Sequence, residues 1–419
     1  MRKLVLLCLV LGSFLEVGAD EKLHLVKILV TGSQRYQQQE LVRALGLTEG
    51  SLVTRAELDA APRHLSESGL FTTVEYSFGP TSGVRGIEAH FQVKDTEKTL
   101  PAEFENFVWW DDATLEADLK GAIPLYHGQI GMNGSFPDVI AAELTKLLVA
   151  KGVDGKVMWQ QWAAPGQLPS AYRFRISPGA PRVANVELQG ADHLPGNALS
   201  WFTLALKGHE YLRSEVNKDV EHTLLASYRE RGFLSAKVSS VETIPGEDRN
   251  VSLKLTLAEG PQYHVADLRW TGLTVATPEQ LSKFIKLKPG DTANLEQLNL
   301  QLQSAKKFLG RFGRIAAEIQ PLPAFSDDKV SYELKVSEGD LYRMGDLDVE
   351  GLDTAAVQRL HELWKLQAGS PYDSSYTADF VRHLVMTRPG VVYNCEFLEQ
   401  QDDAQKVVNV LLQFKAQRQ

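Results

Sequence analysis

Residues 268–313 read LRWTGLTVATPEQLSKFIKLKPGDTANLEQLNLQLQSAKKFLGRFG, and this stretch decides the fold. A strand that alternates apolar and polar residues ends at Gly272, Gly290 separates two stretches with helical patterning, and Gly313 closes the second stretch. Residues 330–336 alternate again, so one face of the sheet should be buried. The order predicts a strand-helix-helix-strand-strand unit. The second helix should face the sheet through apolar residues at helical spacing, namely Leu298, Leu302, Ala305 and Leu309.

These three landmarks recur in the same order along the chain. The strand-ending glycines are Gly32, Gly190, Gly272 and Gly351, of which the last three are 82 and 79 residues apart. The glycines between helices follow one another at spacings of 78, 80, 82 and 79 residues, at Gly50, Gly128, Gly208, Gly290 and Gly369. The closing glycines are Gly69, Gly152, Gly232, Gly313 and Gly390. A chance repeat would not keep three landmarks in phase, so the sequence predicts tandem units of about eighty residues.

The glycine between helices is expected to end the first helix of each unit, because glycine adopts the left-handed conformation of a helix end without strain. Thr54-x-x-Glu57 and Asn294-x-x-Gln297 follow two of these glycines and resemble capping boxes, which begin helices. Two helices in series are therefore expected in each unit.

Composition bounds the class of protein. The chain has 419 residues, 43% of them hydrophobic and 23% charged, which is typical of several globular domains. Its net charge of −9 disfavours nucleic acid or anionic lipid as the main partner, since both need concentrated Lys and Arg. Arg2 and Lys3, an apolar stretch at residues 4–15 and Val17-Gly18-Ala19 predict a signal peptide over residues 1–19, cleaved near Ala19. The alternative is an N-terminal core helix. Export would leave Cys395 as the single cysteine, expected to be buried on a strand.

No enzyme pattern is found. The 10 histidines are scattered, and neither His209-Glu210 nor His361-Glu362 continues to the second histidine of a zinc protease helix. The sequence has no G-x-S-x-G elbow, no phosphate-binding G-x-x-x-x-G-K and no calcium loop. It therefore predicts no enzymatic activity, no metal and no cofactor.

The first unit carries a family resemblance. Val30-Thr31-Gly32, then Leu45-Gly46 through Gly50, then Gly69-Leu70-Phe71 give an order that resembles the POTRA (polypeptide-transport-associated) domain. Five such units resemble the periplasmic arm of BamA-type outer-membrane protein assembly factors. The resemblance implies an α+β fold of five tandem POTRA-like β-α-α-β-β domains, each a three-stranded mixed sheet covered by two antiparallel helices.

The expected domains cover nearly the whole chain. Their bounds are 23–96, 101–178, 182–260, 263–340 and 341–417, and the second is a divergent, Trp-rich copy. Assembly factors of this kind continue into a β-barrel, whereas this sequence stops at Gln419, directly after the last expected strand. We therefore expect no barrel in this sequence, and the alternative is a truncated assembly factor whose barrel is missing from it. The resemblance then implies a chaperone or scaffold role rather than membrane insertion.

In POTRA domains the second strand lies at a sheet edge, where unpaired backbone groups can accept an extended client. Alignment on the closing glycine gives candidate edges at residues 73–78, 236–241, 316–320 and 392–397. Candidate partner-binding residues on them are Val74, Tyr76, Val238, Ile319 and Tyr393. The alternative for each edge is that a neighbouring domain covers it.

The second unit offers a candidate aromatic patch. Its members are Trp109, Trp110, Trp159 and Trp162. Trp109 and Trp110 are adjacent, so on a strand one of them would face outward. The alternative is ordinary core packing.

Together these patterns predict a non-enzymatic periplasmic scaffold or chaperone for outer-membrane protein assembly or secretion, possessing membrane association only through its partners. Expected partners are an outer-membrane β-barrel protein or its unfolded precursors, with an accessory lipoprotein as a further candidate, and no nucleic acid. The alternative is a structural envelope or cell-division interaction protein unrelated to barrel biogenesis.

Overall fold

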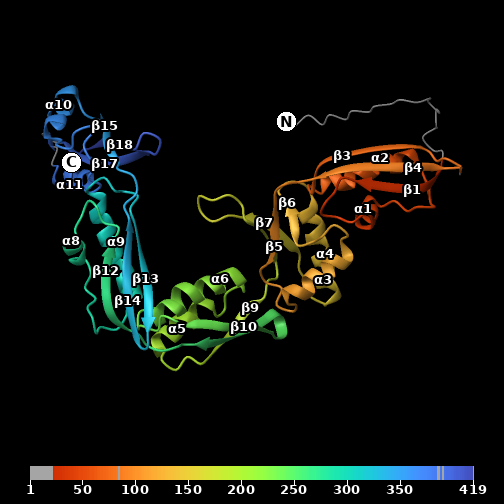
Figure 1. Ribbon diagram of the computed structural model, residues 1–419, viewed down its shortest axis with the longest axis horizontal. Helices are drawn as coiled ribbons and strands as arrows, with labels where there is room; N and C mark the ends of the chain where they lie inside the picture. Colours follow the sequence, from red (N-terminus) through yellow and green to blue (C-terminus); the bar gives the residue numbers. More distant parts are fainter. Residues whose placement is uncertain (1–21, 84, 385–386, 389–390, 419) are drawn as a thin grey trace. The chain divides into compact units, whose positions relative to one another are not determined.

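The computed structural model describes residues 22–83, 85–384, 387–388 and 391–418 (Figure 1). The predicted signal peptide and the closing glycine Gly390 lie outside these residues. The described strands form five separate sheets that follow one another along the sequence, with helices between the strands. The first, second, fourth and fifth sheets are mixed, because each contains a parallel and an antiparallel strand pair. The α+β prediction is therefore confirmed, whereas the five domain boundaries stay predictions.

The chain divides into two compact units. One comprises Met1–Glu187, Thr203–Asn217 and Glu242–Lys254, and the other comprises Leu188–Phe202, Lys218–Val241 and Leu255–Gln419. The division passes through the third sheet. The first unit holds the first two sheets, and the second unit holds the last two.

The first sheet has the strand order β2-β1-β4-β3. β1 is parallel to β4, and β3 is antiparallel to β4. The elements of this region are β1 (Leu23–Thr31), α1 (Gln38–Leu45), β2 (Leu52–Val53), α2 (Arg55–Glu67), β3 (Phe71–Pro80) and β4 (Ile87–Asp95).

The second sheet repeats this plan with the order β6-β5-β8-β7. Its elements are β5 (Thr99–Phe104), α3 (Asp112–Ala122), β6 (Gln129–Gly131), α4 (Phe136–Ala150), β7 (Val157–Trp162) and β8 (Ala171–Ile176). The third sheet has three strands in the order β10-β11-β9. Its region contains β9 (Arg182–Gln189), α5 (Gly196–Leu206), α6 (Arg213–Asp219), a π-helical turn at Val220–Leu225, α7 (Ala226–Arg229), β10 (Lys237–Pro245) and β11 (Asn250–Ala258).

The fourth sheet, of order β12-β14-β13, has three strands, and the fifth, of order β15-β18-β17-β16, has four. Their elements are β12 (His264–Thr271), α8 (Pro278–Ser282), α9 (Leu295–Gly310), β13 (Glu318–Ser326), β14 (Lys329–Ser337), β15 (Arg343–Glu350), α10 (Thr354–Leu363), α11 (Tyr376–His383), β16 (Thr387–Arg388), β17 (Val391–Asp402) and β18 (Val407–Arg418). Three of the five sheets thus gain a short fourth strand, β2, β6 or β16, beyond the predicted three.

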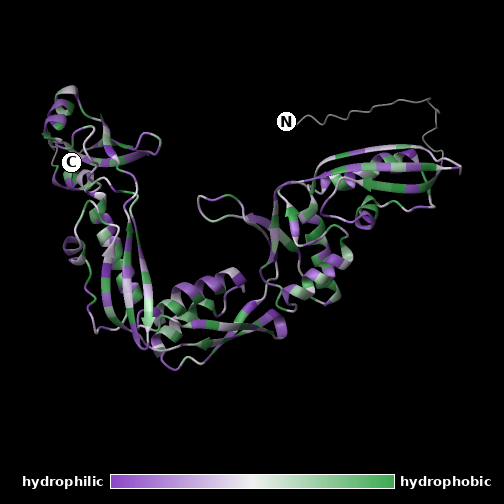
Figure 2. Cartoon of the chain, in the orientation of Figure 1, coloured by the Kyte–Doolittle hydropathy of each residue, from purple (hydrophilic) through white to green (hydrophobic). Residues whose placement is uncertain are grey.

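The buried residues follow the predicted periodicities. α9 packs on the fourth sheet through Leu298, Leu302, Ala305 and Leu309, each at most 3% exposed. β14 presents its alternate residues to this core, and apolar and polar colours alternate along the strands in Figure 2. No helix within the described ranges is long and apolar enough to cross a membrane. Burial of one sheet face against the helices therefore holds each of these regions together.

The strand-ending glycine is required by a close backbone approach. At Gly272 φ is +77°, and an added Cβ would lie 2.2 Å from the Val336 carbonyl oxygen. Gly32, Gly190 and Gly351 meet the last strand of their own sheets in the same way. A side chain at this position would push the first strand away from its parallel neighbour.

In the first and fourth regions the glycine between helices does not end the first helix, which corrects the prediction there, whereas Gly208 comes two residues after the end of α5. α8 ends at Ser282, eight residues before Gly290, and α1 ends at Leu45 with Gly46 as its left-handed cap. Instead, the Gly290 N–H donates to the Val265 carbonyl oxygen at 2.8 Å, and Gly50, Gly208 and Gly369 donate to the first strands of their own regions at 2.7 Å. The left-handed turn at φ +93° aims this N–H at the strand. The helix starts at Thr54 and Asn294 are confirmed.

A carboxylate fastens the loop after the first strand in three of the regions. Glu338 accepts hydrogen bonds from the backbone N–H groups of Thr274 and Val275 at 2.6 and 3.0 Å. Asp95 and Glu259 do the same for the loops that follow Gly32 and Gly190. Each acid lies two residues after the strand residue that meets the glycine.

Three of the closing glycines join one region to the next. The Tyr263 N–H donates to the Gly232 carbonyl oxygen at 2.8 Å, and the Tyr342 N–H donates to that of Gly313 at 2.9 Å. Gly69 meets the second region through Asn133, whose carbonyl oxygen would lie 1.5 Å from an added Cβ. The third landmark is therefore a junction as well as a helix end.

Candidate functional site

The predicted edge strands are located by the order of each sheet. β3, β10 and β13 are the outermost strands of their sheets, as predicted, and β7 is outermost in the second. In the fifth sheet, β16 pairs with Val391 and Val392 of β17. The start of the predicted edge 392–397 is therefore covered, because the chain folds back on itself there, and Tyr393 lies beyond the covered part.

Backbone pairing shows which groups of β3 are open. The Thr81 N–H donates to the Gly86 carbonyl oxygen at 3.0 Å, and this register continues along the strand pair. In an antiparallel pair every second residue bonds inward, so the N–H and C=O groups of Val74, Tyr76 and Phe78 point away from β4. β3 thus presents three consecutive outward positions with no proline among them.

The side chains of these three residues lie half-buried on the core. The Tyr76 ring stacks between Phe78, at 6.5 Å, and Phe91, at 5.8 Å, and its hydroxyl donates to Asp59. The opposite face of the strand is polar and exposed at Thr73, Glu75 and Ser77. A strand added to β3 would therefore find an apolar row on one face and a polar row on the other.

The β13 edge has a different chemistry. Pro321 and Pro323 lie at alternate positions of a strand that pairs without interruption with β14. Proline has no N–H, so an edge strand accommodates it where the nitrogen faces away from the partner strand. Two outward donors beside Ile319 are therefore missing. The sequence shows these prolines, but their position on one side of an edge required the register.

The remaining predicted contacts are half-buried side chains. Val238 lies on β10, whose other residues are almost all exposed, and Ile319 and Tyr393 pack on the cores of their own sheets. Edge residues of this kind would meet a partner mainly through their backbone.

The four tryptophans do not form one patch. Trp109 and Trp110 lie in a turn before α3, not on a strand, and contact each other edge to face at 6.1 Å. Trp159 packs on the helix side of β7, where its indole N–H donates to Asp138 at 2.8 Å. Trp162 lies on the other face of β7. The prediction of adjacent strand residues was wrong because the chain turns directly after Phe107 to begin the helix.

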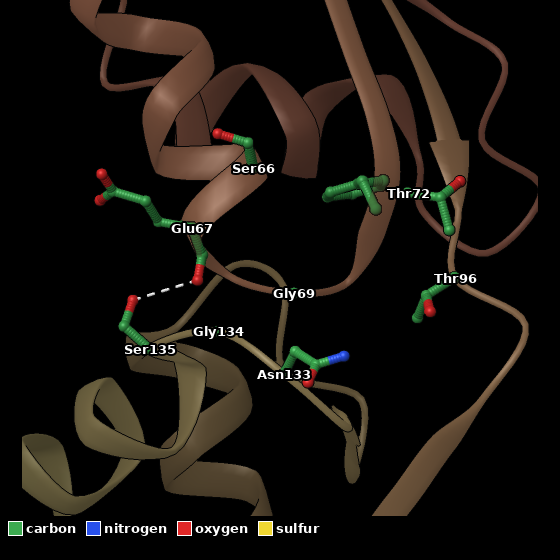
Figure 3. A pocket seen from close by; sticks show the side chains of 9 residues that line it. Ser66, Glu67, Gly69, Thr72, Thr96, Asn133, Gly134 and Ser135 are labelled. Atoms are coloured by element: carbon green, nitrogen blue, oxygen red, sulfur yellow. Dashed lines mark hydrogen bonds between the residues drawn. The ribbon is translucent and has the colours of Figure 1, made fainter. Parts of the chain in front are cut away.

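The cleft where the first region meets the second has a volume of about 470 Å³ (Figure 3). Backbone and small polar side chains line it, including Gly69, Asn133 and Ser135. The Ser135 hydroxyl and N–H both donate to the Glu67 carbonyl oxygen, at 3.2 and 2.7 Å. In the part of the chain that the structure covers, no three His, Cys, Asp or Glu side chains gather as a metal site would require. The cleft lies at the junction between the first two regions.

Cys395 lies half-buried on β17, packed on the fifth core, rather than fully buried as predicted. Burial, followed by the neighbouring Glu396 carboxylate, raises the pKa of its thiol to about 11. Such a thiol is protonated at neutral pH and therefore unreactive.

Comparison with known proteins adds sequence relatives and similar structures. The family model of POTRA, described as a surface antigen variable number repeat, matches residues 263–339. Outer membrane protein assembly factor BamA of Neisseria meningitidis serogroup B (strain ATCC BAA-335 / MC58) is 21% identical over 184 residues. This alignment covers 43% of the chain and 23% of that protein, so the chain spans less than a quarter of this relative.

Two solved structures are also similar to this chain, at lower sequence identity than the relative above. POTRA3-5 of BamA from Haemophilus influenzae is 17% identical, with a TM-score of 0.42, over 56% of this chain and 96% of that one. The N-terminal domain of Omp85 from the cyanobacterium Thermosynechococcus elongatus is 14% identical, with a TM-score of 0.19, over 76% and 97%. Residues 263–339 thus match the POTRA family, and the chain is similar in sequence to part of BamA.

Proposed function

We propose that this protein is a non-enzymatic periplasmic scaffold that binds extended polypeptides by strand addition, in the assembly or secretion of outer-membrane proteins. The similarity to an outer membrane protein assembly factor supports the process. The open edge of β3 supports the mode of binding. A periplasmic location follows from the predicted signal peptide over residues 1–19.

The observation that carries this proposal is the run of outward backbone groups at Val74, Tyr76 and Phe78. Main-chain hydrogen bonds bind an extended segment with little demand on its sequence. The half-buried row of these three side chains favours a client with an apolar residue at every second position. Strands of outer-membrane proteins alternate in this way. Unfolded outer-membrane proteins are therefore the proposed clients, and an accessory lipoprotein docked on another edge is a second partner.

In-cell photocrosslinking tests the proposal. A photoreactive residue replaces the exposed Glu75 on β3, and captured proteins are identified by mass spectrometry. Outer-membrane proteins should be recovered, and Val74→Pro should lower their yield by about fivefold or more, because it removes one outward N–H. Val74→Ala is the matched control, since it shortens the same side chain but keeps the N–H.

A photoreactive residue at Gln320 on β13 provides an internal comparison, because the neighbouring prolines remove outward donors. It should capture far fewer clients than position 75. Recovery of cell-division or cell-wall proteins alone at position 75 would favour the structural alternative. Equal yields from the Pro and Ala variants would exclude strand addition at β3.

A further inference from the structure

The outer face of the second sheet is uncharged along β7. Residues 157–171 contain no Asp, Glu, Lys or Arg. Met158 is 52% exposed, Gln160 is exposed, and Trp162 completes this row on the face that points away from the helices. Edge strands normally carry charges or prolines that prevent pairing, and β7 itself carries neither.

The backbone of β7 is open at its edge. The Ser170 N–H donates to the Trp162 carbonyl oxygen at 2.9 Å, and the Ser177 N–H donates to that of Lys156 at 2.8 Å. Even-numbered residues therefore bond to β8, and the groups of Trp159 and Gln161 point outward. The Val157 N–H, which also points outward, is occupied by the Thr145 hydroxyl at 3.2 Å. The open edge thus begins after Val157.

A positive charge without a partner lies next to this row. Arg175 is directly opposite Met158 in the strand pairing, so both side chains are on the outer face. Arg173, its neighbour on β8, lies 3.9 Å from the ring centre of Trp162 and pairs with Glu103 at 2.8 Å and Glu105 at 3.4 Å. The Arg175 side chain has no ion pair or hydrogen bond within the described residues. Arg173 is already neutralised by the two glutamates, so the charge that stays uncompensated next to the β7 row is that of the Arg175 guanidinium.

From these features we propose that the β7 edge and its outer face form a second docking site, specific for an extended segment of a partner protein that carries a carboxylate two residues from an apolar residue, so that both face the same side. The segment adds as a strand to the N–H and C=O groups of Trp159 and Gln161. Its apolar side chain covers Met158 and Trp162, and its carboxylate pairs with Arg175. The inference rests on the proposed strand addition but assigns a separate edge and an acidic partner.

The test uses the full chain with a photoreactive residue at Gln160. The probe is the synthetic peptide Thr-Val-Asp-Thr-Phe-Val-Thr, in which Asp and Phe share one face of the strand, compared with the same peptide carrying Lys in place of Asp. The acidic peptide should be captured about tenfold more efficiently, because a hydrogen-bonded ion pair is formed with only one of them. Arg175→Gln should abolish the difference, whereas Lys120→Gln, the same charge change on α3, should preserve it. If the chain that keeps Arg175 captured the two peptides equally, the proposal would be overturned.

The backbone contribution is tested with Gln161→Pro against Gln161→Ala. Both lose the side-chain hydrogen bonds to Met132 and Tyr172, but only the first loses the outward N–H. Capture should fall at least about fivefold in the Pro variant relative to the Ala variant. Equal capture would exclude strand addition at β7.

A parallel experiment in the Val74→Pro background separates the two proposals. Capture at position 160 should persist there, since β3 is not involved. If the chain without Val74→Pro captured clients at position 75 but captured nothing at position 160, only the β7 inference would be contradicted. Absence of capture at both positions would contradict strand addition in general.

Discussion

Glu338 shows how one side chain organises the loop after a strand. Its carboxylate is 9% exposed and accepts hydrogen bonds from two backbone N–H groups and the Thr274 hydroxyl. Burial alone would raise the pKa of Glu338, but these hydrogen bonds and the nearby Arg314 bring it below its usual range. The ionised form is therefore stabilised in the folded protein.

Glu338→Ala should destabilise this loop by about 2 kcal/mol, because two amides lose a charged acceptor. Hydrogen–deuterium exchange at Thr274 and Val275 should become about 30-fold faster. Asp328→Asn, on an exposed residue of the same region, is the control and should leave both rates unchanged. Unaltered exchange in the Ala variant would show that the carboxylate does not hold the loop.

The same loop should respond to pH. A folded-state pKa below the unfolded value gives stability that is present above the ordinary glutamate pKa and is lost as pH falls through the folded pKa. Protection of the Thr274 amide should therefore decrease in acid, after correction for intrinsic exchange, more steeply than in Glu338→Ala. Parallel pH profiles would contradict this linkage.

Cys395 gives a second residue-level prediction. Because the pKa of its thiol is about 11, alkylation by iodoacetamide in the folded chain should rise with a midpoint near pH 11. In urea the midpoint should return to about 8.5, the value of an unperturbed cysteine. A folded-state midpoint at the unperturbed value would show that the thiol is not shielded.

Sequence patterns predicted some residues and missed others for physical reasons. Leu298 and Leu302 were predictable because burial imposes a helical period. Asp95, Glu259 and Glu338 were not singled out, since each binds a loop more than sixty residues away. All three acids lie two residues after the apolar strand residue that contacts the strand-ending glycine. This shared position was the sequence signal that could have identified them.

The edge strands differ in what their backbone offers. β3 has three outward positions without proline, whereas Pro321 and Pro323 remove donors from β13. Edges interrupted in this way resist pairing with other chains. Under the proposed function, strand addition is therefore expected at β3 and not at β13.

Replacing both prolines should open the β13 edge. In Pro321→Thr/Pro323→Thr, a photoreactive residue at Gln320 should capture clients with a yield comparable to that of position 75. Thermal stability should change little, because threonine suits a strand and the inward ladder is unaltered. If the double variant stays as inert as the parent, something other than the missing donors blocks this edge.

The three main strands of each unit followed from alternation and glycine spacing, but the short fourth strands and the helix ends did not. Gly290 was expected to stop a helix, whereas its N–H binds a strand residue far earlier in the chain. Trp109 and Trp110 were placed on a strand although the chain turns there. Local sequence patterns indicate which residues are buried and where the backbone needs a glycine. They do not indicate which distant backbone atom such a glycine binds.

Contacts between successive regions depend on the closing glycines. In Gly69→Ala the new Cβ would collide with the Asn133 carbonyl oxygen, so the first two regions should separate while each stays folded. Trypsin should then cleave at the exposed Lys98 several-fold faster. Gly152→Ala is the matched control, since φ is +76° there, close to the +74° of Gly69, but nothing lies within 4 Å. Equal cleavage rates in the two variants would show that this contact does not protect the linker.

The Gly232–Tyr263 and Gly313–Tyr342 hydrogen bonds join backbone atoms at equivalent positions of successive regions. A gene duplication that copied the segment from one glycine to the next would create a new boundary with the same donor and acceptor. A deletion of that segment would restore the same bond between the flanking parts. A single recombination event can therefore change the number of regions without requiring new side chains at the boundary. Chains with more or fewer regions can arise in this way.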